Sequence, residues 1–216
     1  MPVTQRPYPV VLLLEGRKVL VVGGGAVARD KVVGLVAAGA VVHVVAPSVS
    51  EAVRAQPVTW EERPYRLGEV VGYRFVVACT DDAEVNEQVF LDGEAAGVFV
   101  NAADDPAHCS ATLPARLERG PVLVAVSTGG HSPALAGWLR DRIGELVGPE
   151  VGVLAELLSE ARAELTRLGE RRPAAVWRAA LDSGMLEHLR NGRPAEARQQ
   201  LQAALDLPGE PAPERP

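Results

Sequence analysis

A short apolar run that ends in three glycines constrains the fold of this chain more than any other feature. A helix-compatible segment follows the glycines at once. Gly23, Gly25 and Ala28 fit the pattern G-x-G-x-x-G/A, in which a tight turn, a close approach of a pyrophosphate and close helix–strand packing each need a small residue. An ordinary strand-to-helix turn is the structural alternative. The strand and helix signals on both sides favour a dinucleotide site at the helix N-terminus.

Charge and apolar pattern exclude several classes of protein. The chain has 216 residues and a formal net charge of −6, which argues against a general nucleic-acid binder. Its apolar runs are shorter than the roughly 20 residues that span a bilayer, and residues 1–7 lack the apolar segment of a signal peptide. Cys79 and Cys109 form neither a disulfide framework nor a metal cluster. We therefore expect a cytoplasmic protein without a membrane or nucleic-acid partner.

Strand-like and helix-like segments alternate through the first half of the chain. The run 41–46 is almost wholly apolar, which suits a parallel sheet covered on both faces. Asp81 or Asp82 is expected to cap a helix over 83–96. The strands expected are 19–22, 41–46, a weaker one around 58–61, 75–79 and 98–101. This alternation predicts an α/β fold, a Rossmann-type doubly wound parallel sheet.

The pattern changes near residue 110. Two strand-like runs, 111–117 and 121–127, are separated only by 118–120, which is a hairpin signal rather than a helical crossover. A helix is expected to begin at Pro133, with Ser132 as its N-cap. The middle of the chain therefore predicts a small α+β segment.

The last third of the chain is expected to be helical. Apolar stripes run over 154–168 and 176–189, and a shorter helix is predicted over 194–205. Because three short helices alone make a thin core, we expect them to pack on the middle segment or on another subunit. The segment 208–216 has the composition of a disordered tail.

The carboxyl ends of the expected strands locate a candidate site, because parallel sheets bind ligands beyond that edge. Ser48, after the second strand, could hydrogen-bond a ribose or cap the next helix. That strand end carries neither an acidic residue for a 2′-hydroxyl nor a cation for a 2′-phosphate, and Arg54 is the nearest basic residue onward. These residues slightly favour NAD over NADP. The segments that meet at this edge are 23–28, 46–48, 80–82 and 101–106.

Two carboxylates follow the fifth expected strand. Asp104 and Asp105 stand beside the position where a nicotinamide would lie, and a carboxylate there can accept a proton as a hydride leaves. The structural alternative is an Asp-Pro turn with solvated side chains. His131 is equally open between a functional residue and a loop residue. The four scattered histidines form neither a serine-histidine-acid triad nor zinc-ligand spacing, so no metal ligands are expected.

Four ordered motifs together resemble one known family. They are 21–28 with Lys31, 78–82 with Val85 and Asn86, 101–106, and 124–136. In this order they are similar to the precorrin-2 dehydrogenase / sirohydrochlorin ferrochelatase family, which also forms the N-terminal module of sirohaem synthases. The similarity extends from about Tyr8 to about Leu205.

The resemblance implies an activity and an architecture. The implied reaction is the NAD-dependent oxidation of precorrin-2 to sirohydrochlorin, and in some members the same site then inserts Fe2+ as a co-substrate to give sirohaem. The implied architecture is a homodimer. The implied domains are an NAD-binding Rossmann domain over 1–110, a dimerisation segment over 111–149, a helical C-terminal domain over 150–207 and a tail over 208–216.

The resemblance also implies roles for individual residues. The family's essential aspartate, in Asn-x-x-Asp-x-Pro, falls on Asp104 and not on Asp105. The cofactor contacts expected in this chain are Gly23, Gly25, Ala26, Val27, Pro47, Ser48 and Thr80. The residues expected to bind the tetrapyrrole substrate are Ser127, Thr128 and His131, and Arg116, Arg119, Arg140 and Arg142 are candidates to pair with its carboxylates.

Some alternatives stay open on the sequence. Thr128 stands where sirohaem synthases can carry a phosphorylated serine, which puts that regulation in doubt for this chain. The resemblance does not include the methyltransferase module, so another protein is expected to make precorrin-2. A dehydrogenase without chelatase activity fits the same residues. A non-catalytic, NAD-sensing Rossmann regulatory module would explain the glycine loop but not the 101–106 and 127–136 motifs.

Overall fold

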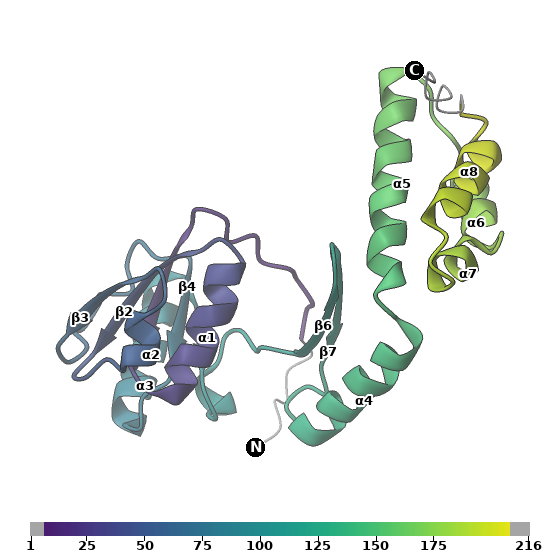
Figure 1. Cartoon of the computed structure of the whole chain (residues 1–216). Helices are drawn as coiled ribbons and strands as arrows, with labels where there is room; N and C mark the ends of the chain where they lie inside the picture. The colour runs from purple at the N-terminus through teal and green to yellow at the C-terminus, as the bar shows by residue number, and fades with distance from the viewer. Residues whose placement is uncertain (1–6, 208–216) are drawn as a thin grey trace. The chain divides into compact units, whose positions relative to one another are not determined.

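The computed structural model describes residues 7–207 and contains a five-stranded parallel sheet (Figure 1). Its strands are β1 (Lys18–Val22), β2 (Val41–Ala46), β3 (Thr59–Glu62), β4 (Phe75–Ala78) and β5 (Phe99–Ala102). They lie in the order β3-β2-β1-β4-β5, and all pairs are parallel. The chain moves outward from β1 to β3 and then returns to the other side of β1. This doubly wound order confirms the predicted fold class and places a ligand crevice at the carboxyl ends of β1 and β4.

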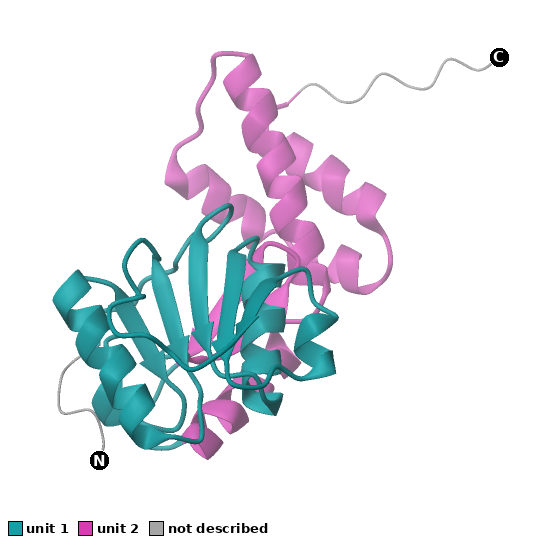
Figure 2. Cartoon of the chain, turned by 90° about the vertical axis from the view of Figure 1, so that its left-hand side faces the viewer, with its two compact units in different colours: residues 1–113, 127–132 teal, residues 114–126, 133–216 magenta. Residues whose placement is uncertain are grey.

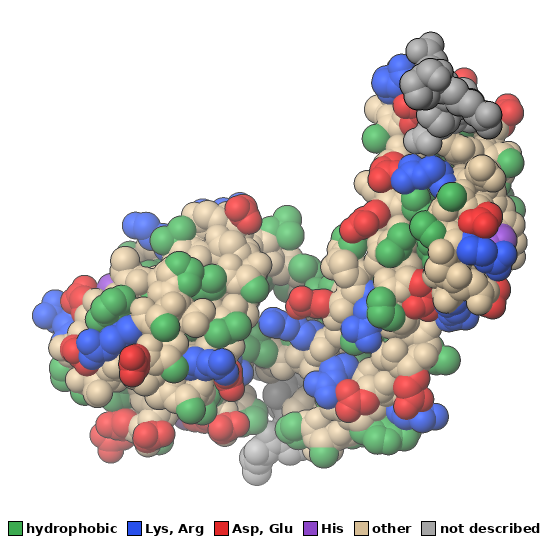
Figure 3. Space-filling model, viewed as in Figure 1, with side chains coloured by type: hydrophobic (Ala, Val, Ile, Leu, Met, Phe, Trp, Pro, Cys, Tyr) green, Lys and Arg blue, Asp and Glu red, His purple; other side chains and the backbone are tan. Residues whose placement is uncertain are grey.

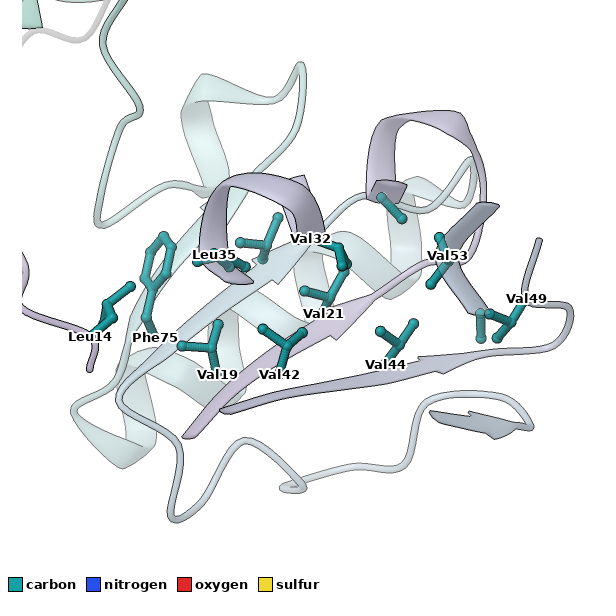
Figure 4. Packing of buried hydrophobic residues seen from close by; sticks show 13 residues of the cluster. Leu14, Val19, Val21, Val32, Leu35, Val42, Val44, Val49, Val53 and Phe75 are labelled. Atoms are coloured by element: carbon teal, nitrogen blue, oxygen red, sulfur yellow. The ribbon is translucent and has the colours of Figure 1, made fainter. Parts of the chain in front are cut away.

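Helices cover the sheet through two apolar cores. On one face, α1 (Ala26–Ala37) packs Val32 and Leu35 against strand residues such as Val21 (Figure 4). On the other face, Val89 of α3 (Ala83–Ala96) packs against the opposite side chains of the same strands. The strands β1, β2 and β4 are largely apolar because both faces of the sheet are buried there, whereas the edge strand β3 is exposed. Two short elements complete the unit, α2 (Glu51–Arg54) and the 3-10 helix η1 (Pro106–His108).

The hairpin is shorter than the sequence predicts. It consists of β6 (Ala115–Arg119) and β7 (Val122–Val126), joined at Gly120 and Pro121 rather than over 118–120. The expectation that the first strand starts at residue 111 was wrong. The amides of Ser110 and Ala111 both donate to the carbonyl of Val100, at 2.9 and 3.0 Å, so this stretch is held by β5 instead.

The chain divides into two compact units (Figure 2). The first comprises residues up to Leu113 together with Ser127–Ser132, and the second comprises Pro114–Val126 and the chain from Pro133 onward. The second unit holds the hairpin and the helices α4 (Pro133–Leu146), α5 (Glu150–Arg167), α6 (Ala174–Leu181), α7 (Met185–Arg190) and α8 (Pro194–Leu205).

The helices α5 to α8 share one apolar core. Met185 and Leu205 are fully buried in it, and Leu201 is nearly so. The single stripe expected over 176–189 is broken into α6 and α7, because Gly184 adopts a left-handed conformation with φ of 96°. Among residues 7–207, no helix is long and apolar enough to cross a membrane. The expectations for the N-terminal residues 1–6 and for the tail 208–216 lie outside the described residues.

Candidate functional site

The glycine loop leaves open space at the start of α1. A Cβ added to Gly25, the N-cap of α1, would meet nothing within 4 Å, so a ligand can approach the backbone there. The first-turn amides, which include those of Ala26 and Val27, have no acceptor inside the helix. Ala28 is fully buried, as close packing of helix on strand requires. The loop therefore fits the pyrophosphate of a dinucleotide.

The other two glycines hold the loop in place. A Cβ on Gly23, whose φ is 131°, would stand 2.5 Å from the carbonyl oxygen of Cys79. A Cβ on Gly24 would stand 2.1 Å from the carbonyl oxygen of Ser48. The middle glycine therefore seats the loop after β2 against the glycine loop, and the amide of Ser50 donates to the Gly24 carbonyl at 2.9 Å. Sequence reasoning assigned no role to Gly24, although the run of three glycines was a signal.

The segment after β2 exposes two cofactor candidates. Pro47 and Ser48 are exposed, and Val49 behind them is almost fully buried. Of the two roles left open for Ser48, helix capping is not realised, since α2 begins at Glu51 with Ser50 as its N-cap. Ser48 is placed where its hydroxyl is accessible to a ligand at the carboxyl edge of the sheet.

Thr80 is fixed by a network at the start of α3. Asp82 caps the helix, as expected, and accepts hydrogen bonds from the amides of Glu84 and Val85 at 3.0 and 3.3 Å. The hydroxyl of Thr80 donates to the Asp82 carbonyl at 2.8 Å. The buried Asn86 side chain donates to the Thr80 carbonyl at 3.0 Å and accepts from its amide at 3.2 Å. Sequence reasoning did not predict this role for Asn86.

The two aspartates after β5 have different environments. Asp105 caps η1 and lies 2.5 Å from Nδ1 of His108, whose hydrogen bond lowers the pKa of the Asp105 carboxyl. Asp104 is exposed and adopts a left-handed backbone with φ of 60°. Within residues 7–207, its carboxylate has neither a hydrogen bond nor an ion pair. A ligand at this edge can therefore meet a free carboxylate at Asp104, whereas Asp105 is already engaged.

The loop that carries Asp104 is shaped by Cys109, whose role the sequence left open. Its sulfur accepts a hydrogen bond from the Ala102 amide at 3.2 Å and lies 3.3 Å from the Asp105 carbonyl oxygen. Burial raises the pKa of the Cys109 thiol. The buried Asn101 side chain donates to the Ala111 carbonyl at 3.0 Å and closes the loop. No sequence signal distinguished Cys109, because its partners depend on the loop conformation.

The candidate substrate residues form one compact turn that groups with the first unit. The hydroxyl of Ser127 accepts from the Gly129 amide at 3.2 Å. Thr128 Oγ1 accepts from the Ser132 amide at 3.1 Å, and Nδ1 of His131 lies 2.8 Å from the Thr128 carbonyl oxygen. These contacts fix the turn, and the His131 ring remains exposed on it.

The arginines proposed to pair with substrate carboxylates lie in the second unit and have partners there. Arg116 pairs with Glu118, Arg140 with Asp141 and Arg142 with Glu145, while Arg119 donates to the Val147 carbonyl. Among the described residues, no cluster of histidine, cysteine and acidic side chains could hold a metal ion.

Known proteins match most of this chain. Residues 10–115 match an NAD(P)-binding family model, and residues 119–146 match the family described as sirohaem biosynthesis protein central. "Siroheme synthase" of Nitrosococcus oceani is 37% identical over 204 residues, which cover 92% of this chain and 44% of that protein. "Siroheme synthase" of Photorhabdus laumondii is 34% identical over 213 residues, which cover 94% of this chain and 45% of that protein.

A solved structure matches over nearly the same span. It is titled "SirC, precorrin-2 dehydrogenase" and superposes with a TM-score of 0.71 at 26% identity, covering 91% of this chain and all of that one. The chain is thus similar over most of its length to proteins of sirohaem biosynthesis. It spans less than half the length of the siroheme synthases that it matches.

The two segments that match family models contain the candidate site residues. The NAD(P)-binding match includes the glycine loop, the β2 and β4 loops and the loop that carries Asp104. The central sirohaem match includes the turn from Ser127 to His131 and ends with α4. The resemblance seen in the sequence is therefore confirmed at the level of the family.

Proposed function

We propose that this chain is an NAD-dependent precorrin-2 dehydrogenase that produces sirohydrochlorin in sirohaem biosynthesis. The observation that carries the proposal is the exposed carboxylate of Asp104, which has no partner among the described residues and lies at the same sheet edge as the open glycine loop. The names of the similar proteins, siroheme synthase and precorrin-2 dehydrogenase, support the substrate and the reaction.

Different residues of the site bind the cofactor and accept the proton in this reaction. The loop at Gly23 and Gly25 and the amides of α1 bind the cofactor phosphates, and Ser48 is accessible for the adenosine ribose. When bound, NAD+ supplies the hydride acceptor. As the hydride leaves the substrate, Asp104 accepts the accompanying proton, because its carboxylate is exposed and has no hydrogen bond within residues 7–207. Thr80, held by Asp82 and Asn86 at the end of β4, contacts the cofactor on that side of the site.

The left-handed backbone at Asp104 makes one substitution especially informative. Asparagine tolerates a positive φ, so Asp104→Asn should keep the loop while removing the proton acceptor. We expect the variant to lose about 100-fold or more in turnover and to bind NADH like the wild type. Asp105→Asn is the matched control and should retain turnover at neutral pH.

The assay follows NADH formation and the absorption spectrum of sirohydrochlorin after precorrin-2 and NAD+ are mixed with the protein. Near-normal turnover by Asp104→Asn would overturn the assigned role of Asp104. A wild-type chain that binds NADH but never converts precorrin-2 would instead support the sensing module that the sequence left open.

Metal insertion and assembly are separate parts of the proposal. We infer that Fe2+ is a co-substrate in a second step, and adding Fe2+ or Co2+ to sirohydrochlorin while recording the spectrum tests it. We also infer a homodimer formed through the segment 111–149. Exposed apolar side chains support it, since Leu123 of β7 is 45% and Trp138 of α4 is 59% exposed. Light scattering that gives the monomer mass would contradict the dimer.

A further inference from the structure

Two arginines near the carboxyl end of β3, Arg54 of α2 and Arg63, are paired with glutamates. Nη2 of Arg54 lies 2.7 Å from Oε1 of Glu62. Arg63 pairs with Glu61 at 2.6 Å and with Glu69 at 2.7 Å. Figure 3 shows basic and acidic side chains lying next to one another over this part of the first unit. Both guanidinium groups are therefore engaged by carboxylates.

Glu62 reaches from β3 to the loop that follows β2. The register pairs Glu62 with Ala46, the last residue of β2. Its carboxylate accepts a hydrogen bond from the Val49 amide at 3.1 Å, and Nε of Arg54 donates to the Val49 carbonyl at 2.9 Å. The Val49 amide and Arg54 hold the pKa of the Glu62 carboxyl below its usual range. Both polar groups of Val49, the residue after Ser48, are thus held by one ion pair.

This ion pair lies beside the loop after β2, and sheets of this type hold the adenosine ribose of a dinucleotide near that loop. NAD has a 2′-hydroxyl on its adenosine ribose, and NADP has a 2′-phosphate, which an arginine after β2 accommodates in other sheets of this type. Arg54 contacts the β2 loop at Val49, but its guanidinium is engaged by Glu62, and its Cζ lies 5.9 Å from the centroid of the Trp60 ring. The Glu62 carboxylate would also repel a phosphate at short range.

We propose that Glu62 selects NAD over NADP by engaging Arg54 and by placing a negative charge beside the 2′ position of the adenosine ribose. Glu62 is a specificity residue that acts through Arg54 and the loop at Val49. This inference rests on the proposed cofactor site. It assigns the preference for NAD to an acidic residue of β3, since the end of β2 carries none.

Direct binding tests the proposal without turnover. NADH and NADPH are titrated separately into the full chain, and cofactor fluorescence gives the two dissociation constants. The measured quantity is the ratio of the NADPH constant to the NADH constant. Glu62→Gln should lower this ratio about fivefold or more, because one nearby charge is removed and Arg54 is released. In the double variant Glu62→Gln, Arg54→Gln, most of this decrease in the ratio should disappear, because the released arginine is absent.

Two single variants serve as controls. Glu61→Gln removes the same charge from the neighbouring residue of β3, where the partner is Arg63, and should keep the ratio within about twofold of the wild type. Arg54→Gln alone leaves the Glu62 charge unpaired and should raise the ratio. Glu62→Gln should lower the ratio and Arg54→Gln should raise it. Because each variant has its own expected direction, either one tests the proposal if the other fails to fold.

Each other outcome has a definite meaning. An unchanged ratio in Glu62→Gln, or an equal shift in Glu61→Gln, would overturn the inference while leaving the cofactor site intact. Shifts of the same sign in Arg54→Gln and Glu62→Gln would also overturn it. A wild-type chain that binds neither NADH nor NADPH would overturn the proposed function instead.

Discussion

Gly23 and Cys79 meet backbone to backbone at the carboxyl edge of the sheet. The space for a Cβ on Gly23 is filled by the Cys79 carbonyl, 2.5 Å away, and the Cys79 amide donates to the Val22 carbonyl at 2.8 Å. The end of β4 therefore supports the glycine loop that follows β1. Burial raises the pKa of the Cys79 thiol to about 12, which agrees with a structural residue rather than a reactive thiol.

Gly23→Ala should therefore reduce the stability of the fold, whereas Gly25→Ala should reduce cofactor binding. Gly23→Ala places a methyl group against backbone at a positive φ and should lower the free energy of unfolding by at least about 2 kcal/mol. Gly25→Ala meets open space and should change stability by less than about 0.5 kcal/mol, but its methyl group should weaken NADH binding. Urea unfolding and NADH titration measure the two effects. Equal losses of stability in both variants would contradict this division of roles.

Cys109 should tolerate serine better than alanine. Cys109→Ala leaves the buried Ala102 amide without its sulfur acceptor and should cost about 1–3 kcal/mol of unfolding free energy. Cys109→Ser retains a polar atom there and should cost clearly less. Chemical denaturation of both variants measures the difference, and an alanine variant as stable as the serine variant would show that the sulfur contact contributes nothing.

Asp105 should make the stability of the first unit depend on pH. Its pKa is lowered in the folded chain by His108, so its contribution is present above the unfolded pKa of about 4 and is lost as the pH falls through the folded value. Asp105→Asn should cost about 1 kcal/mol at pH 7, since the pair is partly exposed, and the difference from the wild type should shrink below about pH 5.

Thermal unfolding between pH 3 and pH 7 tests the Asp105 prediction. The control is Asp81→Asn, because Asp81 is exposed and has no hydrogen bond or ion pair within the described part of the chain. A difference between Asp105→Asn and the wild type that grows at low pH would contradict the assigned hydrogen bond between Asp105 and His108.

The helical core should be sensitive to truncation at Leu201. Leu201 belongs to α8, and its side chain is 2% exposed in the core that α8 shares with α5. Leu201→Ala should therefore lower the free energy of unfolding by about 2–5 kcal/mol. Leu168→Ala, at a site that is 41% exposed, is the matched control and should cost less than about 1 kcal/mol. Far-ultraviolet circular dichroism in urea follows the loss of helix. Similar costs at both sites would mean that α8 does not pack as described.

Local patterns in the sequence predict much of the sheet and its site. The apolar run before Gly23 and the alternation to residue 101 predict all five strands within a few residues, and Asp82 caps α3 as expected. These predictions succeed because strand burial, turns and caps depend on residues close together in the chain. The start of the hairpin was misplaced because Ala111 bonds to Val100, and a contact across a loop leaves no periodic signal.

The sequence by itself determined the doubly wound fold class, the glycine loop and the motifs that carry the resemblance. Only the tertiary structure decided that Gly24 seats the loop after β2, that Cys109 shapes the loop of Asp104 and that Glu62 engages Arg54. It also separated the free carboxylate of Asp104 from the engaged one of Asp105. The physical reason is that these roles depend on atoms that folding brings within hydrogen-bond or van der Waals distance from different loops and strands, and spacing along the chain does not encode such distances.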